Sequence, residues 1–290
     1  MADQKIQRGA CMYGKIKSLL VAILVLAFLA SPLAAAESYV FGSHPFKNPA
    51  ELAGVFRPMI SLLEEATGAK ISFRSARDYE AFSQAVVAGE IDIFFMGPSL
   101  FAEIHAQHPD KIRLVATAKD QGKPTFNGVI VARKDSGINT LADLKGKKFA
   151  FGDRSSTLSA YLPAVMLMEA GVFDSLQQYD FTGRHDNVAN SVLQGRHDAG
   201  GLKPDVAAKY LDQGLKVIAE SEPVYEHVIA VGPKVDAATL KKIQDALVGA
   251  KDPAVYTSIN AGYTGFAVTR AEDYARLLEI MKKVDAKIAQ

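Results

Sequence analysis

Short apolar runs alternate with amphipathic stretches along most of this chain. Runs such as residues 39–41, 91–95 and 148–151 have the length of strands, and stretches such as 49–67 have the apolar spacing of a helix. This alternation is typical of parallel strands joined by crossover helices. The sequence therefore predicts an α/β protein.

The pattern predicts an order of elements along the chain. Strands are expected at 39–41, 70–73, 91–95, 112–118, 128–133, 148–151, 179–182, 216–219 and 227–231. Helices are expected at 49–67, 79–88 and 204–211. Three further helices are expected, one that begins at Pro98, one that runs through 166–168 and one that ends at 193–195. Beyond residue 231 the chain is expected to be almost entirely helical to Gln290.

A second α/β alternation begins at Leu141, inside the first one. After it, the chain returns to the first alternation. This nesting predicts two lobes joined by a double crossover, with hinges near 131–134 and 229–232. The first lobe would contain residues 37–131 plus 232–290, and the second lobe residues 132–231. A single larger doubly wound domain is the alternative.

The first 36 residues have the features of a secretory signal peptide. Lys15 and Lys17 precede an apolar run at 19–30, which is too short to span a bilayer comfortably. Small residues at 34–36 offer a cleavage site. Export to the periplasm is therefore expected, with an uncleaved membrane anchor as the alternative and Met12 as a second possible start.

Composition excludes several classes of function for the mature protein. The chain's one cysteine, Cys11, lies within the expected signal, so disulfides, thiolate metal sites and cysteine nucleophiles are excluded. A net charge of +1 argues against a nucleic-acid surface. His105 and His108 have no further ligands at metal-binding spacing, so neither a metal nor a cofactor is predicted.

The stretch from Phe149 to Thr157 joins a strand to a helix start. An apolar strand runs into Gly152-Asp153, and the hydroxyl residues Ser156 and Thr157 follow. The free N–H groups of a helix's first turn, together with such hydroxyls, form a pocket for an oxyanion. The alternative is that Ser156 or Thr157 serves only as an N-cap.

Other polar side chains also follow predicted strands, at the edge where open α/β sheets bind ligands. These candidates are His44, Tyr79 and Ser99 in the first lobe, and Ser156, Thr157, His185 and Asp205 in the second. Each has a structural alternative: Tyr79 as a packing aromatic, Ser99 as a cap, His185 as a solvated loop residue. Asp205 could simply favour a helix's first turn.

Catalytic patterns are weak in this chain. It contains no G-x-S-x-G, no H-E-x-x-H and no phosphate-loop lysine pattern. A triad of Ser156, His185 and Asp205 can be written, but any chain of this length contains those three residue types. A binding protein is therefore favoured over an enzyme, with a secreted hydrolase using Ser156 as a remote alternative.

Taken together, these segments resemble the periplasmic substrate-binding proteins of phosphonate/phosphite/phosphate ABC transporters, over about residues 39–247. The motifs that carry the resemblance are 67–68, 76–79, 89–92 before Gly97-Pro98, 139–146, 151–153 with Ser156-Thr157 and Pro163, 183–186, and 195–199. The resemblance implies a two-lobe periplasmic binding protein fold (type II) that binds an oxyanion between the lobes.

The resemblance also implies roles for individual residues. The family's aromatic residue falls on Tyr79, its Ser-Thr anion loop on Ser156 and Thr157, and its histidine on His185. An acidic residue about twenty positions further on falls on Asp205. Hydroxyls, helix N–H groups and His185 would donate to the anion, and Asp205 would accept from a protonated oxygen or an amine.

Three departures from the family pattern concern the ligand. Phe101 stands where many relatives have tyrosine, and Leu158 and Ser159 replace a third hydroxyl and a glycine of the anion loop. Where relatives commonly have Pro-His-Asp, this chain has Tyr-Glu-His at 225–227, with His227 as the last residue. These changes argue against an aminoalkyl phosphonate because the acidic group for its amine is not in its usual place.

The sequence thus predicts a monomeric periplasmic protein that captures phosphite, phosphate or a phosphonate and delivers it to an ABC permease in the inner membrane. The expected ligand-binding residues are Tyr79, Ser99, Phe101, Ser156, Thr157, Ser159, His185 and Asp205, with His44 and His227 as further candidates. The main alternative is a periplasmic sensor that signals to a membrane histidine kinase or cyclase.

Overall fold

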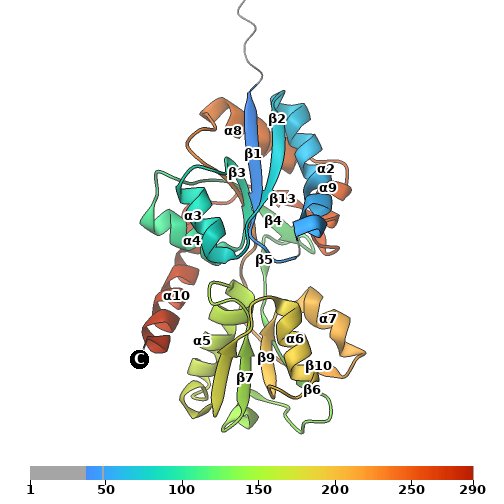
Figure 1. Ribbon diagram of the computed structural model, residues 1–290, viewed down its shortest axis with the longest axis vertical. Helices are drawn as coiled ribbons and strands as arrows, with labels where there is room; N and C mark the ends of the chain where they lie inside the picture. The colour runs from blue at the N-terminus through green and yellow to red at the C-terminus, as the bar shows by residue number, and fades with distance from the viewer. Residues whose placement is uncertain (1–36, 48, 290) are drawn as a thin grey trace, which may run out of the picture. The chain divides into compact units, whose positions relative to one another are not determined.

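The computed structural model describes residues 37–47 and 49–289, so the predicted signal peptide lies outside the described residues. These residues form two α/β lobes, each built on its own sheet (Figure 1). The six strands of the first sheet are β1 (Ser38–Ser43), β2 (Lys70–Ser75), β3 (Ile93–Met96), β4 (Arg113–Asp120), β12 (Val228–Val231) and β13 (Tyr263–Ala267). The five strands of the second are β6 (Val129–Arg133), β7 (Lys148–Phe151), β8 (Gln178–Phe181), β9 (Ala199–Leu202) and β10 (Leu215–Glu220).

Helices cover both sheets. Those of the first lobe are α2 (Pro49–Thr67), α3 (Tyr79–Val87), α4 (Pro98–Gln107), α8 (Ala237–Val248), α9 (Ala254–Thr257), η4 (Ala271–Tyr274) and α10 (Ala275–Ile288). Those of the second lobe are η1 (Leu141–Leu144), η2 (Thr157–Tyr161), α5 (Leu162–Glu169), η3 (Phe173–Ser175), α6 (His185–Leu193) and α7 (Pro204–Leu211).

The two sheets share one strand order. It reads β2-β1-β3-β12-β4 in the first lobe, with β13 added at the edge, and β8-β7-β9-β6-β10 in the second. In each sheet the fourth strand is the first one after the chain crosses between lobes, and it lies antiparallel to its neighbours. This order with a double crossover is the predicted two-lobe fold.

The lobes are held by apolar residues whose spacing matches each element. In α2, Leu52, Phe56, Met59 and Leu63 recur every three or four residues and are all fully buried. They form one stripe that packs beneath the first sheet beside α8. Central strands β3, β12 and β9 are buried along their whole length, as expected for strands covered on both faces.

The predicted positions of the two crossings between the lobes are wrong. The expected hinges at 131–134 and 229–232 fall within or at the end of β6 and β12, yet each of these strands belongs wholly to one sheet. The crossing segments are instead β5 (Thr125–Phe126) and β11 (Val224–Tyr225), which pair with each other in a separate two-stranded sheet. Only two residues separate each crossing from the strand that follows it, Asn127-Gly128 before β6 and Glu226-His227 before β12. So short a break was not recognised as the boundary between lobes.

The prediction of an almost entirely helical C-terminal part is also wrong. Beyond residue 231 the chain is not almost entirely helical, because β13 returns to the edge of the first sheet beside β4. This strand is short and contains Gly265, whose φ of 128° is accessible to glycine and strained for other residues. Helical periodicity on both sides of so short a segment hides it.

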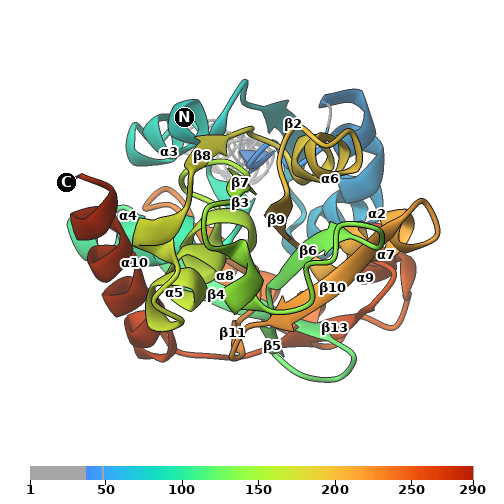
Figure 2. The same ribbon diagram turned by 90° about the horizontal axis from the view of Figure 1, so that it is seen from below.

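Helix α10 contacts both lobes (Figure 2). It packs against α4 of the first lobe and α5 of the second. Asp285 lies 3.6 Å from the Arg154 guanidinium, and Lys287 lies 2.6 Å from Asp174 of the second lobe. Such exposed ion pairs contribute little stability individually.

Across 37–47 and 49–289, none of the helices has both the length and the apolar character that crossing a bilayer requires.

Candidate functional site

A cavity of about 530 Å³ lies between the two lobes. Eight of the ten predicted site residues line it: His44, Tyr79, Ser99, Ser156, Thr157, His185, Asp205 and His227. The N-termini of α3, α4, α6 and α7 supply four of them, because each helix begins just after the carboxyl end of a strand. Free N–H groups and the helix dipole make such an edge favourable for an anion.

Two predicted residues do not line the cavity. Phe101 is fully buried, and its ring centroid lies 5.0 Å from that of Tyr274. It is two positions after Ser99 on α4, which turns it to another face of the helix. Ser159 is also fully buried, beneath Gly152, and its Oγ has no hydrogen-bond partner among the described residues. The departures noted at these two positions therefore do not alter the cavity wall directly.

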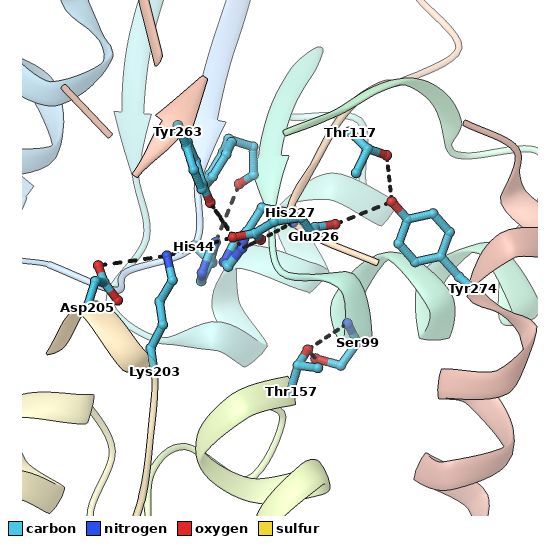
Figure 3. Close-up of polar contacts among 11 residues, drawn as sticks. His44, Ser99, Thr117, Thr157, Lys203, Asp205, Glu226, His227, Tyr263 and Tyr274 are labelled. Atoms are coloured by element: carbon cyan, nitrogen blue, oxygen red, sulfur yellow. Dashed lines mark hydrogen bonds and ion pairs between the residues drawn. The ribbon is translucent and has the colours of Figure 1, made fainter. Parts of the chain in front are cut away.

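Ser99 and Thr157 join the two lobes by hydrogen bonds (Figure 3). The Ser99 backbone N–H donates to Thr157 Oγ1 at 3.0 Å, and the Thr157 hydroxyl donates to Ser99 Oγ at 2.8 Å. The Ser99 hydroxyl in turn donates to the Ser155 carbonyl at 2.6 Å. Each hydroxyl therefore has its single proton engaged, that of Thr157 with Ser99 and that of Ser99 with Ser155.

Ser156 fills both of the roles considered for it. Its side chain caps the following helical turn by accepting from the Ser159 N–H, and it also lines the cavity beside Thr157. Tyr79 of the first lobe lines the same cavity as Ser156. Burial, followed by the nearby Asp153 carboxylate, raises the pKa of Tyr79, so its hydroxyl stays protonated and can donate.

Asp78 fixes the start of α3 and thereby the position of Tyr79. Its Oδ1 accepts from the Ala81 N–H at 2.7 Å. Removing this cap in Asp78→Ala is expected to lower the free energy of unfolding by about 1 kcal/mol, measured by urea denaturation. Asp78→Asn keeps a capping oxygen and should stay close to the wild-type value. Equal stability of Asp78→Ala and wild type would contradict this role.

His185 begins α6 and is held as a neutral imidazole. Its Nδ1 accepts from the Lys203 backbone N–H at 3.1 Å. Burial, and then the positive charge of Lys203, lower the pKa of His185 to about 4. Because Nδ1 is an acceptor, the proton of the neutral ring resides on Nε2. His185 therefore serves as a hydrogen-bond donor that carries no charge at neutral pH.

His44 and His227 form a stacked pair on the first-lobe side of the cavity. Their ring centroids lie 5.4 Å apart at an angle of 22°. Burial, and then the neighbouring His227, lower the pKa of His44 well below its usual value. His44 is thus neutral at neutral pH, and the pair presents imidazole edges rather than two charges.

Glu226 lies completely buried next to the cavity and was not predicted as a site residue. Its carboxylate accepts from His227 Nδ1 at 2.5 Å and from the Tyr263 hydroxyl at 2.9 Å. Burial alone would raise the pKa of Glu226, but the charges of His227 and Lys203 and the hydrogen bonds from His227 hold it below the usual value. Glu226 is therefore ionised.

Lys203 places an ammonium group in the cavity wall. It, too, was not predicted as a site residue. It precedes Pro204 at the start of α7, and its Nζ lies 3.9 Å from both Asp205 Oδ2 and Glu226 Oε1 (Figure 3). The same Nζ lies 5.2 Å from the centroid of the Tyr263 ring. Its place directly after β9 is the signal that could have identified it, since that rule already selected Asp205.

The arrangement suits an anion better than a metal. Hydroxyls, imidazole N–H groups, helix N-termini and the Lys203 ammonium are donors, whereas metal ions need lone pairs. In residues 37–47 and 49–289, His, Cys, Asp and Glu side chains form no group of three or more that could hold a metal ion.

Residues 41–274 match the sequence profile of one protein family, described as "ABC transporter, phosphonate, periplasmic substrate-binding protein". Among characterised relatives, the chain is 29% identical over 225 residues to the phosphate-import protein PhnD of Mycolicibacterium smegmatis, covering 72% of this chain and 70% of that protein. It is 28% identical over 145 residues to the phosphonates-binding periplasmic protein of Escherichia coli, covering 48% and 43%.

Solved structures show the same fold. PhnD1 of Prochlorococcus marinus, in complex with methylphosphonate, has a TM-score of 0.77 at 19% identity and covers 86% of this chain and 98% of that one. A binding protein component of an ABC phosphonate transporter from Pseudomonas aeruginosa has a TM-score of 0.74 at 18% identity, covering 87% and 88%.

The family match spans most of the chain, and the fold agrees with it. The family consists of substrate-binding transport proteins, which sets aside the hydrolase alternative for Ser156. The chain therefore belongs to the periplasmic substrate-binding proteins of phosphonate ABC transporters.

Proposed function

We propose that this protein captures phosphite, phosphate or a phosphonate in the cavity between its lobes and delivers it to an ABC permease. One observation carries the proposal: donors from both lobes and four helix N-termini face a single cavity. The relatives named for phosphate import and phosphonate binding support the same class of ligand.

The proposed binding residues are Tyr79, Ser99, Ser156, Thr157, His185 and Asp205, with His44 and His227 at the first-lobe side. Tyr79 and neutral His185 would donate to the anion's oxygens, and the Thr157 hydroxyl would turn from Ser99 to the anion when the ligand binds. Asp205 Oδ1 is buried and has no hydrogen-bond partner among the described residues, so it would accept from a protonated oxygen. Phe101 and Ser159 would act only through packing.

Closure of the lobes would complete the site. The proposed moving units follow the two sheets, with the crossings at β5 and β11 as the hinge. The N-terminal 36 residues would direct export to the periplasm, where the closed monomer would dock on the permease.

Calorimetric titration of the protein, purified after expression of the full chain, tests the ligand class. Phosphite, phosphate and methylphosphonate are titrated separately, and at least one should bind. Thr157→Val and His185→Ala should each weaken that binding roughly tenfold or more, because a hydrogen bond to a charged ligand contributes about 1.5–3 kcal/mol.

Matched variants outside the cavity serve as controls for these two substitutions. Thr182→Val removes a hydroxyl that donates to the Phe151 carbonyl in the same lobe, and His108→Ala removes a histidine at the end of α4. Both should keep wild-type affinity. Binding that is unchanged in Thr157→Val and His185→Ala would refute the site, and the absence of binding to all three anions would refute the ligand class.

A further inference from the structure

The Lys203 ammonium occupies a place built to receive a cation. Two carboxylates flank its Nζ, Asp205 Oδ2 and Glu226 Oε1, each at 3.9 Å. The Tyr263 ring faces the same Nζ at 5.2 Å, within the range of a cation–π contact. Two acids and an aromatic face are the groups that would recognise the amine of an aminoalkyl ligand.

These groups come from different parts of the fold. Lys203 and Asp205 belong to the second lobe, Tyr263 lies on β13 of the first lobe, and Glu226 lies between the β11 crossing and β12. Glu226 is fully buried and Lys203 side-chain exposure is only 16%. The Glu226 carboxylate already accepts from His227 Nδ1 and from the Tyr263 hydroxyl, and Lys203 adds a further positive charge beside it.

Neither ion-pair distance is a hydrogen bond, since both exceed 3.5 Å. The ammonium therefore forms no hydrogen bond with either carboxylate, and Lys203, Asp205 and Tyr263 all line the cavity. Asp205 Oδ1 is likewise buried without a hydrogen-bond partner among the described residues. The cluster holds a positive charge in position while leaving hydrogen-bonding capacity for a ligand.

We propose that Lys203 is a specificity-determining residue that takes the place of a ligand's amine, so that the protein accepts phosphonates with neutral substituents and rejects aminoalkyl phosphonates. This inference rests on the proposed function. The acidic groups needed for an amine are present in Asp205 and Glu226, but the chain's own ammonium already lies between them and forms an ion pair with each. A second ammonium would meet Lys203 at close range and be repelled.

The test compares two phosphonates of nearly equal size, 2-aminoethylphosphonate and propylphosphonate, by calorimetric titration. They differ chiefly by an ammonium in place of a methyl group, so the ratio of their dissociation constants reports the charge at the end of the chain. Wild-type protein should bind the aminoethyl compound at least tenfold more weakly. In Lys203→Ala this ratio should fall at least tenfold, toward equality or inversion.

Two further variants separate charge from general damage. Lys203→Arg keeps the cation and should keep the rejection of 2-aminoethylphosphonate. Lys209→Ala removes another cation that lines the same cavity from the same helix, and it should leave the ratio unchanged because Lys209 forms no ion pair with Asp205 or Glu226. A shift of the ratio in Lys209→Ala equal to that in Lys203→Ala would overturn the assignment.

The outcomes distinguish this inference from the proposed function. If wild type binds methylphosphonate and binds both larger compounds equally, the inference fails while the function stands. If wild type binds neither larger compound, Lys203→Ala decides: tighter or equal binding of 2-aminoethylphosphonate supports the inference, and weaker binding overturns it. Should Lys203→Ala not fold, wild type and Lys203→Arg decide, since equal binding of the two compounds by either protein refutes the inference.

Discussion

Replacing Gly152 by alanine should weaken anion binding a hundredfold or more. A Cβ at this position would lie 2.0 Å from Ser159 Oγ, 2.6 Å from Ser159 Cβ and 3.0 Å from the Gly183 carbonyl oxygen. The hydroxyl could rotate away, but the Cβ and the carbonyl can move only with their backbones. The methyl group would therefore displace both the helical turn η2, which contains Thr157 and Ser159, and the loop that precedes His185.

Losing the alignment of two donors to a charged ligand costs about 3 kcal/mol or more, and this corresponds to roughly a hundredfold in affinity. The added methyl should also lower the free energy of unfolding by about 1–3 kcal/mol through overpacking. Calorimetric titration with whichever of phosphite, phosphate and methylphosphonate binds wild type measures the first effect, and urea denaturation measures the second.

Two further variants make the explanation specific. Gly152→Ala combined with Ser159→Gly removes both Ser159 clashes and should recover most of the lost affinity. Gly54→Ala in α2 adds a methyl where no atom lies within 4 Å, so it should leave binding unchanged and stability equal or slightly higher. Failure of the double variant to recover any affinity would show that Ser159 is not the cause.

The unliganded protein should lose about 3 kcal/mol of stability through His185 as the pH falls from 6.5 to 4. The pKa of His185 is about 4 in the folded protein, against about 6.5 for an unfolded chain. Between these values the unfolded chain binds a proton that the folded protein does not. Stability is therefore fully present above pH 6.5 and is lost progressively as the pH falls through the folded pKa.

Urea denaturation at a series of pH values between 7.5 and 4 measures this loss. His185→Gln keeps an acceptor for the Lys203 N–H but cannot titrate, so its stability should depend less steeply on pH. The difference between the two proteins at each pH isolates His185, because the other titrating groups, Lys203, Asp205, Asp186 and His227 among them, are common to both. Parallel pH curves would contradict a buried neutral His185.

The sequence predicted elements well where local patterning decides them. Helices α2 and α7 have the expected bounds, and β7 matches residue for residue, because caps, prolines and apolar spacing are local signals. By contrast, β9 consists of Ala-Gly-Gly-Leu and has no strand-like composition of its own. Gly200 and Gly201 are there because a Cβ at either would collide with Val188 or Pro163, and this requirement is tertiary.

The candidate site shows the same division. The rule that ligands bind at the carboxyl ends of strands identified residues such as Tyr79, His185 and Asp205, all of which line the cavity. Phe101 came instead from the family resemblance, which does not say which helix face the residue occupies, and its side chain lies outside the cavity. The rule says nothing of charges brought together from distant segments, and for that reason Glu226, Tyr263 and Lys203 were overlooked as one cluster.

The paired crossings β5 and β11 have a mechanical consequence. Two separate linkers would let the lobes twist and slide as well as bend. Here the crossings are hydrogen-bonded to each other, Val224 opposite Phe126 and Tyr225 opposite Thr125, so they act as one ribbon. A ribbon resists shear in its own plane, because shear would break its hydrogen bonds, and flexes easily across its width. We therefore expect the proposed closure to be a single bending motion, in which the same donors of the two lobes face each other each time the cleft closes.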